Sequence, residues 1–203
     1  MRTRAGIAAA ALGLACAGCG ISPISTSTEV TQYDFGPAPA RKPAPLRQAL
    51  LIYDVSAPGW LDSPSIYYRL AYQDAARPLA YADSRWVGPP AELIGSRVRG
   101  RLAASGKGGI VHPADGARAS YALRVELDEF AQVFDAPKQS RAVVRLRASV
   151  LGRSALLAQK SFSVERPAST ADAEGGVRAL IEASDAAVDQ LVDWTIASLK
   201  DQG

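Results

Sequence analysis

The amino-acid sequence predicts an α+β domain with a mostly antiparallel sheet and two helices packed on one face. Between about residues 123 and 164, three alternating apolar segments follow one another with short connections, which is the pattern of an antiparallel meander. Two further segments, around 90–105 and 170–199, carry apolar residues at helical spacing. A helix with one apolar face has to bury it, and the open face of the sheet is the nearest surface on which it can do so.

Residues 1–18 have the composition of a secretory signal peptide. Arg2 and Arg4 form a basic start, and the run 7–15 that follows is short, apolar and rich in Ala. This run is too short to cross a bilayer as a helix, which needs about 20 apolar residues. We therefore expect residues 1–18 to be removed and to play no part in the mature fold.

Two cysteines, Cys16 and Cys19, lie at the end of this segment. Ala17 and Gly18 directly before Cys19 resemble the bacterial lipobox, which implies that Cys19 is acylated and becomes the mature N-terminus. Cys16 is the rival position, but Leu14 stands two places upstream of it, where the pattern prefers a small residue. The alternative is an ordinary secretory signal with two incidental cysteines. No cysteine follows Cys19, so the mature chain would contain no disulfide, which suits an oxidising compartment.

The charge of the mature chain does not indicate a nucleic-acid partner. The sequence pI is about 9.0, but the signal segment contributes to it. Without Arg2 and Arg4 the 23 basic side chains become 21, against 20 acidic ones. The 185 residues from Cys19 onward (203 minus 18) are enough for one domain with a core and few for two.

Residues 19–45 are expected to form the lipidated cysteine and an extended tether. The stretch 20–32 is rich in Ser and Thr without periodicity, and 36–45 contains four prolines, which favour a stiff, extended backbone. The aromatic triplet 33–35 between them is a candidate edge strand. We expect a single domain over 46–203, with its first motif near residue 33.

The domain is expected to open with a strand over 49–55, which is apolar on both faces and therefore central in the sheet. Alternation predicts a half-buried strand over 66–72 and a shorter strand near 78–81. Prolines 89 and 90 suit the start of a helix, which should end near Ser105.

The three strands of the meander are predicted around 123–128, 144–150 and 156–164. Acids on the first strand would lie beside arginines on the second, a mildly stabilising arrangement. The C-terminal helix follows over 170–199, with a broad apolar face. Its opposite face is marked by Glu182, Asp185, Asp189 and Asp193.

The sequence offers little that points to catalysis or to a metal. His112 is the only histidine, and it has no partners at the spacing that a metal site or a Ser-His-Asp triad needs, so we expect it on a surface loop. The segment 105–109 resembles a phosphate loop, but Gly108 follows Lys107 where that motif needs Ser or Thr, and the segment follows a helix. It is better explained as the turn that ends the helix. We therefore expect a non-enzymatic protein with no cofactor and no metal.

Four residues are candidate partner contacts: Trp60, Leu61, Arg97 and Arg101. Trp60 stands in a Pro-Gly-Trp-Leu-Asp loop, where a large aromatic side chain is either buried or exposed as a contact anchor. Arg97 and Arg101, together with Arg99, could contact lipid phosphate or an acidic partner. The alternative, which is the more common one, is that such a run is the solvated side of a helix.

The segment Tyr33-Asp34-Phe35-Gly36-Pro37 and several later motifs occur in an order that resembles a known family. The later motifs are the strand 51–55, Leu61-Asp62, Arg85-Trp86, Pro89-Pro90-Ala91-Glu92-Leu93, Phe162 and Trp194. With the lipobox, this order is similar to the ABC-type transport auxiliary lipoprotein family, which includes paraquat-inducible protein C. Phe35 stands where the family's Tyr-x-Leu-Gly-Pro opening has Leu.

The resemblance implies a non-enzymatic lipoprotein, carrying acyl chains such as palmitate on Cys19. Its partners would be an MCE-family protein and the ABC permease and ATPase of a system that moves lipids or other hydrophobic cargo between membranes. Homo-oligomerisation would be compatible with ring-shaped MCE partners. Because Gly20, not Asp, follows Cys19, the resemblance favours the periplasmic face of the outer membrane, with the inner membrane left open.

Two other classes of function stay open. An envelope scaffold or assembly lipoprotein, such as an activator of cell-wall synthesis, would share the anchor, the tether and the small α+β domain. A hydrolase is the third class, and it would have to use His112 and nearby acids.

Overall fold

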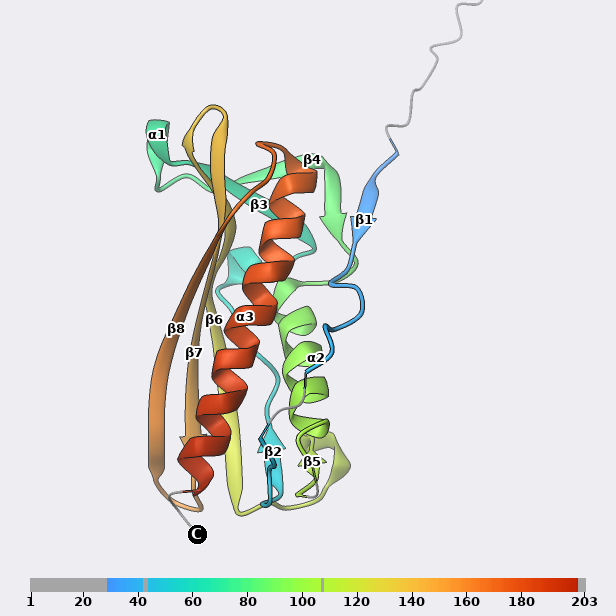
Figure 1. The fold of residues 1–203 in the computed structure, drawn as a ribbon, viewed down its shortest axis with the longest axis vertical. Coiled ribbons are helices and arrows are strands. Elements are labelled where there is room, and N and C mark those ends of the chain that lie inside the picture. The colour runs from blue at the N-terminus through green and yellow to red at the C-terminus, as the bar shows by residue number, and fades with distance from the viewer. Residues whose placement is uncertain (1–28, 42–43, 107, 201–203) are drawn as a thin grey trace, which may run out of the picture.

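The computed structural model describes residues 29–41, 44–106 and 108–200. In this part of the chain, eight strands form one sheet, and two long helices lie beside it (Figure 1). The strands are β1 (Thr31–Tyr33), β2 (Leu50–Ile52), β3 (Ser65–Leu70), β4 (Leu79–Trp86), β5 (Ile110–Val111), β6 (Tyr121–Ala136), β7 (Gln139–Leu151) and β8 (Leu156–Pro167). The helices are α1 (Ala71–Asp74), α2 (Pro90–Ala103) and α3 (Ala173–Lys200), with short 3-10 turns at Gly59–Leu61 and Pro113–Asp115.

The three long strands β6, β7 and β8 form the antiparallel meander that the alternation predicts. Leu123, Val125 and Leu127 of β6 lie opposite Val150, Ala148 and Leu146 of β7, and all six side chains are buried. The register shifts after Leu127, as at a β-bulge, and Phe130 lies beyond the shift in the same core. The apolar positions of the meander therefore form one face of the core.

The sheet as a whole is mixed, so the expectation of a mostly antiparallel sheet is wrong. Parallel pairing joins β2 to the first residues of β6 and β3 to residues 132–134 near its end. Two further pairs, β1 with β4 and β2 with β5, are also parallel. The reason is that β6 is long enough to pair with two short strands along the same edge. Apolar alternation shows which side chains share a face, but it does not show which strands are neighbours.

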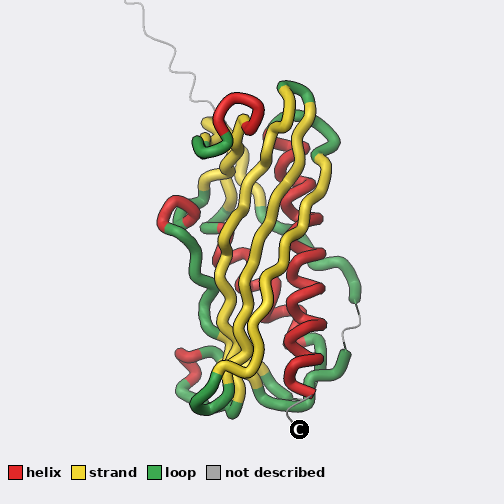
Figure 2. Tube along the Cα trace, turned by 90° about the vertical axis from the view of Figure 1, so that its left-hand side faces the viewer, coloured by secondary structure: helices red, strands yellow, loops and turns green. Residues whose placement is uncertain are grey.

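Helices α2 and α3 lie on the same side of the meander, as predicted (Figures 1 and 2). The apolar face of α3 packs on β7 and β8, and α2 packs on α3. Ile94, Val98 and Leu102 of α2 are buried in the hydrophobic core. Helix α1 is a single turn that begins at Ala71, where the sequence predicts that the strand before it continues to residue 72.

The start of α3 comes very close to the sheet. The side chain of Asp172 accepts a hydrogen bond from the backbone N–H of Gly175 at 2.8 Å, which is the contact of an N-cap. A Cβ atom added to Gly176 would lie 2.0 Å from Oε1 of Gln132. Gln132 is buried, accepts a hydrogen bond from the Tyr81 hydroxyl and donates one to Ser140. A glycine at position 176 is what lets the helix approach this polar group.

Candidate functional site

Residues 34–41, which follow β1, pack along the two long helices. β1 extends the sheet by pairing with Ser84–Trp86 of β4, so a strand does form near the predicted aromatic triplet, although it covers 31–33. Phe35 is 7% exposed and lies edge-on to Trp86, with ring centroids 5.5 Å apart. Residues 31–41 are thus part of the domain. This corrects the expectation of a tether up to residue 45.

Arg97 of α2 holds the first part of this segment. Its Nη2 donates to the carbonyl oxygens of Phe35 at 2.7 Å and Gly36 at 3.1 Å, and its guanidinium lies over the Phe35 ring. Its Nε lies 3.3 Å from Oδ1 of Asp185 on α3. One buried side chain therefore connects α2, α3 and the N-terminal segment.

Arg101, one turn further along α2, repeats this arrangement. Its Nη1 donates to the carbonyl oxygen of Pro39 at 2.5 Å, and its Nε lies 3.1 Å from Oδ1 of Asp189. The contact with Asp189 is close but not aligned as a hydrogen bond, so its attraction is mainly electrostatic. Arg41 in the segment itself completes the row, with Nη1 3.2 Å from Asp189 and Nη2 2.5 Å from Asp193.

Burial opposes the charge of Asp185. Desolvation raises the pKa of this carboxyl group above its usual value, and the nearby Arg97 and Arg101 only partly offset the effect. At the more exposed end of the row, the hydrogen bond to Asp193 raises the pKa of Arg41. The row of three arginines and three aspartates is thus balanced in charge, and Asp185 is the least exposed of its three aspartates.

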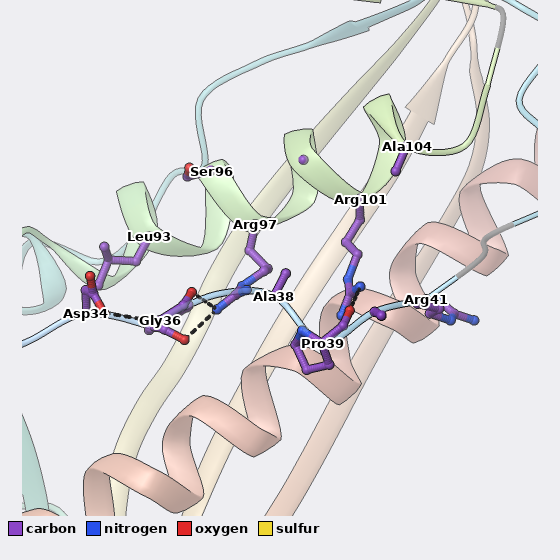
Figure 3. A pocket seen from close by; sticks show the side chains of 13 residues that line it. Asp34, Gly36, Ala38, Pro39, Arg41, Leu93, Ser96, Arg97, Arg101 and Ala104 are labelled. Carbon is purple, nitrogen blue, oxygen red and sulfur yellow. Dashed lines mark hydrogen bonds between the residues drawn. The ribbon is translucent and has the colours of Figure 1, made fainter.

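A groove of about 490 Å³ lies between the N-terminal segment and α2 (Figure 3). It is lined by Asp34, Phe35, Gly36, Ala38, Pro39, Ala40 and Arg41 on one side and by Leu93, Ser96, Arg97, Gly100, Arg101 and Ala104 on the other. The two buried arginines point across it to backbone carbonyl oxygens of the segment (Figure 3). We define this groove, together with the arginine–aspartate row, as the candidate functional site.

The four candidate contact residues are in different environments. Arg97 and Arg101 are 8% and 6% exposed, so the reading of these two as a solvated helix face is wrong, and they bind this chain's own backbone. Leu61 is fully buried. Trp60 is half-buried, edge-on to Tyr67 at 5.2 Å, and its role in a partner contact stays a prediction. Cys19 lies outside the described residues.

That the arginines of α2 face the aspartates of α3 was not predicted from the sequence. Arg97 and Arg101 are four residues apart on α2, as are Asp185 and Asp189 on α3, so each pair lies on one face of its helix. This matching spacing of opposite charges is a signal that could have placed the two helices side by side. The prolines of the N-terminal segment give no sign of its role, since such prolines are also typical of a linker.

His112 lies in a loop, as expected. Its Nδ1 accepts from the backbone N–H of Ala114, and its Nε2 lies 3.2 Å from Oδ1 of the exposed Asp54. Across residues 29–41, 44–106 and 108–200, no group of three or more His, Cys, Asp or Glu side chains is placed to hold a metal ion. In the same part of the chain, no helix has both the length and the apolar character to cross a membrane.

The fold and the site define a class: a small α+β domain whose N-terminal segment is bound by arginines of its own helix. A family model for the ABC-type transport auxiliary lipoprotein component matches residues 33–192. The chain therefore belongs to the family of ABC-type transport auxiliary lipoproteins. The match begins at Tyr33, the last residue of β1, so the bound segment is part of the family domain.

Solved structures share this fold. The protein XCC0632 from Xanthomonas campestris is similar with a TM-score of 0.73 and 24% identity, over 85% of this chain and 98% of that one. An uncharacterised protein matches with a TM-score of 0.60 and 14% identity, over 81% of this chain and 97% of the other. No curated protein matches the sequence.

Proposed function

We propose that this protein is a non-enzymatic accessory of an MCE-type ABC transport system that moves lipids or other hydrophobic cargo between the inner and outer membranes. Its partners would be the MCE-family protein and the ABC permease and ATPase of that system. It would act by binding them, with no cofactor. The observation that carries the proposal is the family match, which covers the bound segment, the sheet and most of α3.

The proposal includes the anchor. Cys19 would be acylated and would hold the domain on the periplasmic face of the outer membrane, since Gly20 follows it where retention in the inner membrane favours Asp. Residues 31–33 pair with β4, and Phe35, Gly36 and Pro39 bind α2, which supports a role for the anchor in positioning. Because the folded domain begins close to Cys19 in the sequence, the tether is short. A short tether would hold the domain near one membrane.

Co-purification tests the transport assignment. The full chain with a C-terminal tag would be expressed in its own host, crosslinked in intact cells and purified from detergent-solubilised membranes. We expect an MCE-family protein and a permease among the partners identified by mass spectrometry. Recovery of a cell-wall synthase without either transport subunit would contradict the proposal and favour the envelope-scaffold alternative. The same preparation reports by its mass whether the protein is a homo-oligomer.

A further inference from the structure

The chain toward Cys19 leaves the domain at one defined end. The N-terminal end of β1 lies at the end of the molecule that carries α1, the β6–β7 turn and the loop before α3 (Figures 1 and 2). The β7–β8 turn and the end of α3 lie at the opposite end. The exit point is fixed, because β1 is paired with β4 and the next residues are bound by Arg97.

The length of the remaining chain limits how the domain can face a membrane. Twelve peptide steps separate Cys19 from Thr31, which span at most about 40 Å at about 3.3 Å per residue. β6 runs between the two ends of the domain and has 16 residues, or about 53 Å at about 3.3 Å each. A membrane-anchored Cys19 therefore brings the end with α1 and the β6–β7 turn close to the bilayer.

A pocket of about 330 Å³ opens at this end, between the β6–β7 turn and the end of β8. Arg141 lines it, with Nη2 3.4 Å from Asp135 and Nε 3.1 Å from Glu165. The third nitrogen of the guanidinium, Nη1, is buried and has no hydrogen-bond partner among the described residues. A buried donor without an acceptor is costly, and a bound anion would satisfy it.

The pocket also has an excess of positive charge. Lys138 and Arg166 line it, and neither forms an ion pair with a carboxylate in the described part of the chain. Among the residues that the structure describes, the Arg166 side chain donates to the carbonyl oxygen of its neighbour Glu165. With Arg141, the pocket has three cations against the two carboxylates of Asp135 and Glu165. Its charge is therefore complementary to that of a phosphate group.

The surface around the pocket has features of a membrane interface. Tyr72 on α1 is 41% exposed, one of the few large apolar side chains in the described chain that are so accessible. The exposed Arg77 follows closely, and Arg69 holds this turn through hydrogen bonds to the carbonyl oxygens of Ala75 and Ala76. Tyrosine and basic residues together are typical of the zone where a protein meets lipid headgroups.

We infer that this end of the domain is a second, non-covalent membrane contact, in which the Arg141 pocket binds the phosphate of an anionic phospholipid. The inference rests on the proposed anchor at Cys19, which brings the pocket to the bilayer. The acyl chains on Cys19 would supply stable attachment, and the basic contact would add electrostatic attraction to anionic headgroups. The contact would also orient the domain, with the β7–β8 turn and the end of α3 pointing away from the lipid.

Vesicle binding tests this inference without the anchor. The mature chain with Cys19→Ala would be sedimented with phosphatidylcholine vesicles, with and without phosphatidylglycerol. We expect binding to the anionic vesicles only, weakened by added salt because screening reduces such attraction. Lys138→Glu combined with Arg166→Glu should lower the affinity for the anionic vesicles by about tenfold or more.

The matched control is Arg118→Glu combined with Arg153→Glu. These exposed arginines lie beside the first residues of β6 and in the β7–β8 turn, at the opposite end of the domain, and their reversal changes the net charge equally. Affinity should be unchanged in this variant, and circular dichroism should show that both variants are folded. No binding of the parent chain to anionic vesicles, or an equal loss in the control, would overturn the inference.

Two further measurements complete the test. Binding of inorganic phosphate in the pocket without any binding to the anionic vesicles would assign the pocket to a free anion and overturn the lipid assignment. Fatty-acid labelling of the unmodified chain reports the anchor separately. A labelled Cys19 with no vesicle binding would contradict only the second contact, whereas vesicle binding without label would contradict only the anchor.

Discussion

The Nε atom of Arg97 on α2 lies 3.3 Å from Oδ1 of Asp185 on α3, while the Nη2 atom of Arg97 donates to the carbonyl oxygen of Phe35. Their side chains are 7% and 14% exposed, so solvent screens this ion pair little. The pair therefore joins the two helices and the N-terminal segment at one point. Its removal should affect both the stability of the domain and the binding of the segment.

Arg97→Ala should lower the free energy of unfolding by about 3 kcal/mol, because it leaves the buried carboxylate of Asp185 without its closest partner. Urea unfolding measures this loss, and hydrogen exchange should show faster exchange at residues 31–36. Arg99→Ala is the control on the same helix. Arg99 pairs at 3.7 Å with Asp54, which is 79% exposed, so the loss should stay below about 1 kcal/mol. Equal losses in the two variants would contradict this account.

Asp185 and Asp172 should change the pH dependence of the free energy of unfolding in opposite directions. Burial raises the pKa of Asp185. Its contribution to the free energy of unfolding is therefore fully present below the pKa of the unfolded state, about 3.8, and is lost as the pH rises through the folded pKa. The pKa of Asp172 is lowered, first by the hydrogen bond from Gly175 and then by that from Thr170. Its contribution is present above about 3.8 and is lost as pH falls through the folded pKa.

Urea unfolding of Asp185→Asn and Asp172→Asn against the parent chain, between about pH 3 and pH 7, measures these contributions. The stability of the parent relative to Asp185→Asn should fall as pH rises. Relative to Asp172→Asn it should rise. Slopes of the same sign for both variants would show that one of the two assignments is wrong.

Gly176→Ala should destabilise the domain by about 1–3 kcal/mol, because the added Cβ would lie 2.0 Å from Oε1 of the buried Gln132. Gly100→Ala on α2 is the control. Apart from its chain neighbours and the backbone of its own helix, no atom lies within 4 Å of a Cβ added there, so the substitution should stabilise the helix by about 0.5–1 kcal/mol. Thermal unfolding of both variants measures the difference, and a neutral Gly176→Ala would mean that α3 does not approach β6 this closely.

Cys19→Ala should abolish incorporation of a labelled fatty acid and leave the protein soluble or unprocessed, since stable attachment depends on the acyl chains. Cys16→Ala should keep the label. Metabolic labelling followed by fractionation measures both variants. Label that persists in Cys19→Ala and disappears in Cys16→Ala would show that Cys16 is the modified residue.

Much of the fold could be predicted from the sequence because its longest elements repeat their pattern most often. Helix α3 was predicted over 170–199 and found over 173–200, and the meander was found where alternation placed it. β2 was predicted over 49–55, yet its ladder covers only 50–52, with a separate bridge from Ser56 to Glu126. Strand direction could not be predicted, because it depends on which segments share an edge of β6.

The candidate site could be predicted less well. The periodicity of α2 separates an apolar stripe from the rest, but it cannot show that the remaining face is covered by another segment. That segment, residues 35–41, buries little beyond Phe35 and is held mainly through its backbone carbonyl oxygens. Every residue has a backbone carbonyl oxygen. A segment that is bound through these atoms therefore shows no characteristic pattern of side chains in its sequence.

The parallel pairing of β1 with β4 has a mechanical consequence. A pull along the axis of β1 would load the ladder from Thr31 to Tyr33 in shear, so that its hydrogen bonds share the force. Peeling, in which bonds break one after another, would need a pull away from the sheet. After the ladder, the packing of Phe35 on Trp86 and the hydrogen bond from Arg97 to Phe35 would also resist the pull. The domain should therefore stay intact under tension along its tether, and yield more readily to a sideways force.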